Sequence, residues 1–151
     1  MCDRLLALIL LVAVVSSVAL ASPTKNSTAL PLSEILGKLD AKYVAVSEVS
    51  FDDGVWEIEA ERDQQSVEVR IGPASGAFLS ERPDGPHLAP PPDALPLTKV
   101  VRQLEETGYG LIREIDLKGA VWDVETSRNG SPRELTVDVR TGKVLADRAD
   151  D

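Results

Sequence analysis

Residues 55–59 read Val-Trp-Glu-Ile-Glu, and residues 121–125 read Val-Trp-Asp-Val-Glu, 66 positions later. Upstream, Pro-Leu-Ser-Glu-Ile-Leu from residue 31 is matched by Pro-Leu-Thr-Lys-Val-Val from residue 96, 65 positions later. Self-similarity at a nearly fixed offset indicates an internal repeat, and a repeat constrains the architecture before any local pattern is interpreted. The sequence therefore predicts two copies of one structural module.

Each copy opens with apolar residues at intervals of three and four, the spacing that places side chains on one helix face. Ser33 and Thr98 stand where a helix N-cap is expected, and Gly108 suits the end of the second helix. We therefore predict one amphipathic helix at the start of each copy. Its apolar residues are Leu32, Ile35, Leu36, Leu39 and Tyr43 in the first copy and Leu97, Val100, Val101 and Leu104 in the second.

The remainder of each copy alternates apolar and polar residues, as strands with one buried and one wet face do. Asp53-Gly54, Lys118-Gly119 and Asn129-Gly130 provide residues suited to tight hairpins. The predicted fold class is α+β, with two tandem repeats, each an α-helix packed on one face of an antiparallel three- to four-stranded sheet. Trp56 and Trp122 are in phase with the apolar positions, so we expect them in the core, with ligand stacking as the alternative.

The chain divides into five predicted segments. Residues 5–20 are almost wholly apolar and run into Ala-Leu-Ala at 19–21, as in a secretory signal peptide. We expect cleavage after Ala21, a secreted or periplasmic location and no stable membrane insertion after cleavage; an uncleaved anchor is the alternative. The segments are 1–21 signal peptide, 22–30 flexible spacer, 31–82 first repeat, 83–95 Pro-rich linker and 96–150 second repeat.

Composition limits the classes of function. The formal net charge is −9, and an acidic protein repels the phosphate backbone, so we expect no nucleic-acid partner. The single cysteine, Cys2, lies in the predicted leader, so the mature chain has no disulfide and no thiolate metal ligand. Apolar burial must then hold the fold together.

The repeat resembles the PepSY domain, the peptidase propeptide and YPEB-like family of the bacterial envelope. Residues 121–125 and the run Val-Asp-Val-Arg-Thr-Gly-Lys-Val-Leu at 137–145 carry the resemblance in the second copy. Residues 71–79 of the first copy lack the Asp-x-x-Thr-Gly core, so the first copy fits less well. The resemblance implies a noncatalytic module that binds, and in some members inhibits or regulates, another protein such as a peptidase.

The residues themselves offer little chemistry. The only histidine, His87, falls in the Pro-rich linker, where we expect a solvated side chain rather than a general base or a metal ligand. Asp52-Asp53-Gly54 contains the beginning of a calcium loop, but hairpin chemistry explains it better. We therefore predict no enzyme activity, no cofactor and no metal site.

The outward-facing sheet positions are the remaining candidates for binding. If the two sheets align across the linker, these positions make one broad acidic surface with a central pair of valines; an ordinary solvated face is the alternative. We predict a partner protein bound there, with regulation of an envelope peptidase; the alternative function is a small-ligand or cation-sensing module of an envelope signalling or transport system. The residues are Val55, Glu57, Glu59, Glu68, Arg70, Val121, Asp123, Glu125, Asp138 and Arg140.

Overall fold

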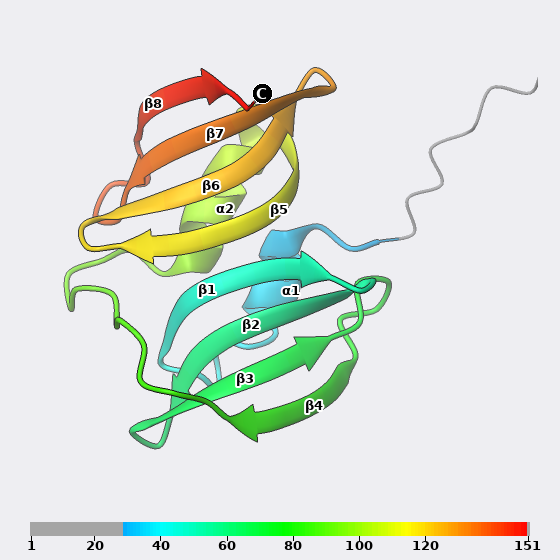
Figure 1. Ribbon diagram of the computed structural model, residues 1–151, viewed down its shortest axis with the longest axis vertical. Helices are drawn as coiled ribbons and strands as arrows, with labels where there is room; N and C mark the ends of the chain where they lie inside the picture. Colours follow the sequence, from blue (N-terminus) through cyan, green and yellow to red (C-terminus); the bar gives the residue numbers. More distant parts are fainter. Residues whose placement is uncertain (1–28, 151) are drawn as a thin grey trace, which may run out of the picture.

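The computed structural model describes residues 29–150, so the predicted signal peptide and most of the spacer lie outside the described residues. Each copy folds as one helix followed by four strands (Figure 1). The first copy comprises α1 (Leu32–Gly37), β1 (Ala45–Asp52), β2 (Val55–Arg62), β3 (Gln65–Ile71) and β4 (Phe78–Pro83). The second comprises α2 (Leu97–Glu106), β5 (Tyr109–Lys118), β6 (Val121–Arg128), β7 (Ser131–Asp138) and β8 (Val144–Ala149).

All eight strands belong to one antiparallel sheet, in the order β4-β3-β2-β1-β5-β6-β7-β8. The α+β class is confirmed, but the prediction of two separate small sheets is wrong. The reason is that β1 and β5 would each be the edge strand of its own meander, with unpaired backbone groups. Pairing the two edges removes both of them and joins the copies (Figure 1).

The β1–β5 junction has an approximate two-fold symmetry. Val49 pairs with Ile115, and these two residues occupy equivalent positions of the two copies, 66 apart. On either side, Glu48 pairs with Asp116 and Ser50 with Glu114. The same surface of each copy thus contacts its counterpart, as in the interface of a symmetric dimer.

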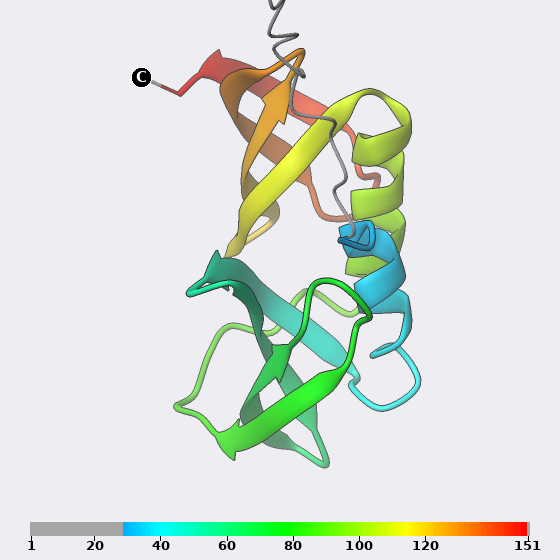
Figure 2. The same cartoon turned by 90° about the vertical axis from the view of Figure 1, so that its right-hand side faces the viewer.

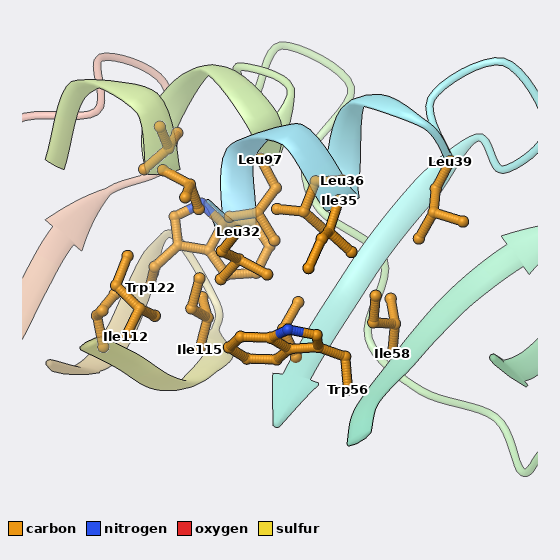
Figure 3. Packing of buried hydrophobic residues seen from close by; sticks show 14 of the residues in the cluster. Leu32, Ile35, Leu36, Leu39, Trp56, Ile58, Leu97, Ile112, Ile115 and Trp122 are labelled. Atoms are coloured by element: carbon orange, nitrogen blue, oxygen red, sulfur yellow. The ribbon is translucent and has the colours of Figure 1, made fainter. Parts of the chain in front are cut away.

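Both helices lie on one face of the sheet, which is plain when the molecule is viewed from the side (Figure 2). Their apolar stripes and the inward side chains of the strands form a single core (Figure 3). Trp122 is fully buried and Trp56 is 7% exposed, so the expected core role of the two tryptophans is confirmed. Because the sheet is continuous, the apolar side chains of both copies share one core.

The expected capping roles of Ser33 and Thr98 are wrong, because the N-caps are Pro31 and Pro96. Ser33 is buried, and its hydroxyl donates to Glu105 of the other helix at 2.5 Å. Thr98 donates to Asp40, just past α1, at 2.9 Å. Residues 40 and 105 are 65 apart, as are 33 and 98, so these two contacts are equivalent across the approximate two-fold axis.

Each copy also contains the same polar contact between a tyrosine at or just before the start of its first strand and a carboxylate of its last strand. The hydroxyl of Tyr43 donates to Glu81 at 2.5 Å, and that of Tyr109 donates to Asp147 at 2.8 Å. Residues 43 and 109 are 66 apart, as are 81 and 147. These repeated residues therefore support the structure, which explains their recurrence in the sequence without reference to function.

We expect Val49→Asp to lower the free energy of unfolding by more than about 3 kcal/mol, because it buries an unpaired charge at the junction of the two copies. Val44→Asp is the matched control: Val44 is 84% exposed, and its replacement should change stability by less than about 0.5 kcal/mol. Urea denaturation monitored by tryptophan fluorescence measures both. Equal effects of the two variants would contradict the contribution of this junction to stability.

Candidate partner-binding face

The sheet face opposite the helices carries a row of carboxylates that crosses the junction between the copies. In the register of the sheet, Glu59 lies opposite Glu48, and Glu48 lies opposite Asp116. The row extends by one residue at each end, because Glu68 pairs with Glu59 and Asp123 with Asp116. Five acidic side chains from five adjacent strands are thus direct cross-strand neighbours.

Like charges directly opposite each other destabilise a sheet, so this row has an energetic cost. Part of that cost is offset by two ion pairs. Arg82 contacts both carboxylate oxygens of Glu68, at 2.9 and 2.5 Å, and Lys118 pairs with Asp116. Among residues 29–150, neither Glu48 at the centre of the row nor Asp123 at its end forms an ion pair, so the row keeps uncompensated negative charge.

The pKa values of two members of the row reflect this crowding. Burial, followed by the charges of Glu48 and Asp84 and a hydrogen bond with Asp84, raises the pKa of Glu59 to about 7. Burial, followed by the charges of Asp116 and Glu114, raises the pKa of Glu48. Desolvation and repulsion between like charges therefore both disfavour the ionised form of these carboxyl groups.

A second row runs beside the first. Glu57 pairs with Arg70 in the sheet and forms an ion pair with it at 3.0 Å. Farther along, Glu114 lies opposite Glu125, and Glu125 lies opposite Glu134. Ser50 of β1 lies between Glu57 and Glu114 in this row. The two rows together place six of the predicted residues on one face: Glu57, Glu59, Glu68, Arg70, Asp123 and Glu125.

Sequence reasoning missed four acidic residues of this face: Glu48, Glu114, Asp116 and Glu134. Their signal was present, because alternation about the buried Val49 and Ile115 turns residues 48, 114 and 116 outward. What the sequence does not show is that β1 and β5 are neighbours. The centre of the face is therefore built from residues that the sequence placed on two unconnected sheet edges.

The expected central pair of valines is wrong. Val55 begins β2 at the β1–β2 hairpin, and Val121 begins β6 at the β5–β6 hairpin. Because β1 and β5 are antiparallel, these hairpins point to opposite ends of the sheet (Figure 1). The two valines therefore lie at opposite ends of the sheet rather than side by side, and acidic residues occupy the centre of the junction.

Asp138 lies at the end of β7, opposite Val121, and Arg140 lies in the turn beyond the strand. Asp138 is the last residue of β7, and its carboxylate accepts from the backbone N–H groups of Arg140 and Thr141. These bonds lower the pKa of Asp138, with the Thr141 hydroxyl making the largest contribution. Arg140 lies beyond the strand and donates to Asp93 of the linker at 2.6 Å, so its placement on the wet face is wrong.

The Pro-rich linker does not run free through solvent. It leaves β4 on the side of the sheet away from the helices and then reaches α2 on the helix side (Figure 2). The His87 side chain is only 13% exposed, and its Nδ1 lies 3.6 Å from a carboxylate oxygen of Glu59. The expectation of a solvated His87 is therefore wrong, because the linker packs this ring against the sheet.

We expect Glu48→Gln to raise the free energy of unfolding at pH 8 by up to about 1 kcal/mol, because it removes repulsion at the centre of the row. The pKa of Glu48 is higher in the folded protein than its ordinary value of 4.5. The folded state therefore binds more protons than the unfolded state above that pH, and wild-type stability falls as pH rises through the shifted pKa. The gain should be much smaller at pH 4, where this carboxyl is mostly protonated in both states.

Thermal unfolding at pH 4, 6 and 8 in chelator-containing buffer measures this effect. Glu34→Gln, on the exposed outer surface of α1, is the control and should leave stability nearly unchanged. A Glu48→Gln protein that is destabilised at pH 8, or stabilised equally at all three pH values, would contradict the repulsion argument.

Several solved structures resemble this chain at low identity. One, from Clostridium difficile 630, is named a "putative lipoprotein"; it is 13% identical, with coverage of 79% of this chain and 90% of its own, and a TM-score of 0.43. A BLIP-like protein from Bacteroides fragilis NCTC 9343 is 13% identical, with 79% and 84% coverage and a TM-score of 0.30. One from Bacteroides eggerthii DSM 20697, named among "putative periplasmic proteins", is 12% identical, with 80% and 88% coverage and a TM-score of 0.30.

No curated protein matches the chain. Among the described residues, no helix has the length and apolar character needed to cross a membrane. The family model described as "Peptidase propeptide and YPEB domain" matches the chain twice, over residues 5–82 and 86–148. These two matches include the alternating strands, the tryptophan segments and both helices of the repeat. The chain therefore belongs to the peptidase propeptide and YPEB domain family and contains two copies of its domain.

Proposed function

We propose that this protein is a noncatalytic, secreted or periplasmic binding protein whose open sheet face contacts a partner protein. Its partner is an envelope peptidase, which it inhibits or regulates. The single observation that carries the proposal is the acidic row from Glu68 to Asp123, which crosses the junction of the two copies.

The acidic row destabilises the folded state, which supports a role for its residues in binding rather than in stability. The repeated contacts of Tyr43 with Glu81 and of Tyr109 with Asp147 stabilise each copy, whereas Glu48 and Asp116 oppose each other across the junction. A partner with basic side chains on its contacting surface relieves this repulsion when it binds. Charge complementarity of this kind mainly increases the association rate and the selectivity for the partner.

The family supports a peptidase as the partner class. Its description names a peptidase propeptide, and a propeptide acts by contacting its enzyme. The helices cover one face of the sheet (Figure 2), and the linker packs against the other face at Glu59, so a partner reaches the rest of the acidic side without any rearrangement of the core. Backbone positions of a preformed face move little on binding, which favours affinity.

The alternative function is a ligand- or cation-sensing module of an envelope signalling or transport system. The observation that favours it is the same group of carboxylates, in which Glu48 and Asp123 form no ion pair within residues 29–150. A sensor should show a ligand-dependent rise in melting temperature without any partner protein present. A peptidase regulator should lower peptidase activity in a saturable way, whether or not a small ligand is present.

The experiment that tests peptidase regulation combines a titration with charge reversal at the junction. Purified wild-type chain is added to an envelope extract, and residual peptidase activity is measured against its concentration at low and moderate salt. We expect saturable inhibition that weakens as salt increases. Glu48→Lys/Asp116→Lys, with two charges reversed at the centre of the row, should weaken inhibition by about tenfold or more.

The matched control reverses the same number of charges on the opposite side of the molecule. Glu34 on α1 and Glu106 on α2 are both exposed, so Glu34→Lys/Glu106→Lys has the same net charge as the junction variant. It should inhibit as wild type does. Equal loss in both double variants would attribute the effect to net charge, and no inhibition by wild type would reject the peptidase as partner.

A further inference from the structure

The start of the linker brings an imidazole side chain, that of His87, to the acidic face. Asp84 follows the last residue of β4, and its backbone N–H donates to the carbonyl of Ser66 at 3.0 Å. This bond fixes the linker beside the sheet. Three residues later the His87 ring packs against the same part of the face, over Glu59 of β2.

The ring of His87 has an unsatisfied nitrogen on this face. Its Nδ1 is shielded from solvent and has no hydrogen-bond partner among the described residues, although the side chain is polar and the surface close by is acidic. A buried polar nitrogen without a partner costs free energy. The 3.6 Å approach to Glu59 is too long for a hydrogen bond and leaves that nitrogen unsatisfied.

Three potential ligand atoms converge at this point. One atom each from Glu59, Asp84 and His87 lies within 4.8 Å of the other two. An imidazole nitrogen with two carboxylate oxygens is a donor set for Zn²⁺ and related divalent transition metals, whereas Mg²⁺ and Ca²⁺ prefer oxygen ligands alone. Because Glu48 and Glu68 flank Glu59 in the acidic row, the local field also favours a cation.

We propose that Glu59, Asp84 and His87 form a binding site for a divalent transition metal of the Zn²⁺ class, which fastens the linker to the outer face of the first copy. The bound metal gives the His87 nitrogen a partner and neutralises two carboxylates of a crowded surface. Both ends of the linker are then held, because Arg140 already binds Asp93 near the second helix. The site does not depend on the proposed peptidase.

The second copy provides an internal comparison. Glu125 occupies the position equivalent to Glu59, 66 residues later, and is likewise on the outer face. Its cross-strand partners are Glu114 and Glu134, and the chain contains one histidine only. Glu125 therefore tests whether a carboxylate at this position binds Zn²⁺ without a nearby imidazole.

The test is a calorimetric titration of the untagged, chelator-treated full chain with Zn²⁺ in the absence of any partner. We expect saturable binding of one Zn²⁺ per chain, unaffected by millimolar Mg²⁺, and a Zn²⁺-dependent rise in melting temperature. His87→Ala and Asp84→Asn should each weaken Zn²⁺ binding by about tenfold or more. Glu125→Gln should bind as wild type does.

Because the chain has a single histidine, its ring signals in the NMR spectrum report directly on this site. They should shift or broaden at one equivalent of Zn²⁺ and stay unchanged with Mg²⁺. Undiminished Zn²⁺ affinity in His87→Ala, equal loss in Glu125→Gln, or ring signals unaffected by Zn²⁺ would each overturn the proposal. None of these outcomes bears on peptidase inhibition, which is measured without added metal.

Discussion

The pairing of β1 with β5 is the constraint on which the rest of the structure depends. It involves three residue pairs centred on Val49 and Ile115. Without it each copy would expose a strand edge, and the two helices would have separate cores to cover. With it, one sheet and one core form, and the helices contact each other through two equivalent hydrogen bonds, from Ser33 to Glu105 and from Thr98 to Asp40.

The local elements were predictable because their signals are local. Apolar spacing of three and four predicted both helices, although α1 ends at Gly37 and the buried Leu39 and Tyr43 of its predicted stripe lie beyond it. Alternation predicted the strands and the burial of Trp56 and Trp122. The junction was not predictable, because no residue type distinguishes an edge that pairs with another edge from one that faces water. An N-cap depends on backbone geometry, so Ser33 and Thr98 matched the pattern while proline held the position.

The acidic face was predicted in part for the same reason. Alternation identified Glu57, Glu59, Asp123 and Glu125 as outward, but register decides which outward residues meet. An antiparallel junction placed Glu48 beside Asp116 and moved both valines to the far hairpins. Similarly, prolines indicate a stiff linker and do not indicate its direction, so the contact of His87 with Glu59 could not be read from composition.

The linker keeps the two copies associated even at low protein concentration. A symmetric interface between two separate chains dissociates as concentration falls, and any surface that spans it is lost. Covalent connection makes the same association intramolecular, with an effective concentration in the millimolar range for a short connection. The surface that spans the two copies therefore persists in a single molecule at any dilution, and its halves are free to differ, as Ser50 and Asp116 at equivalent positions already do.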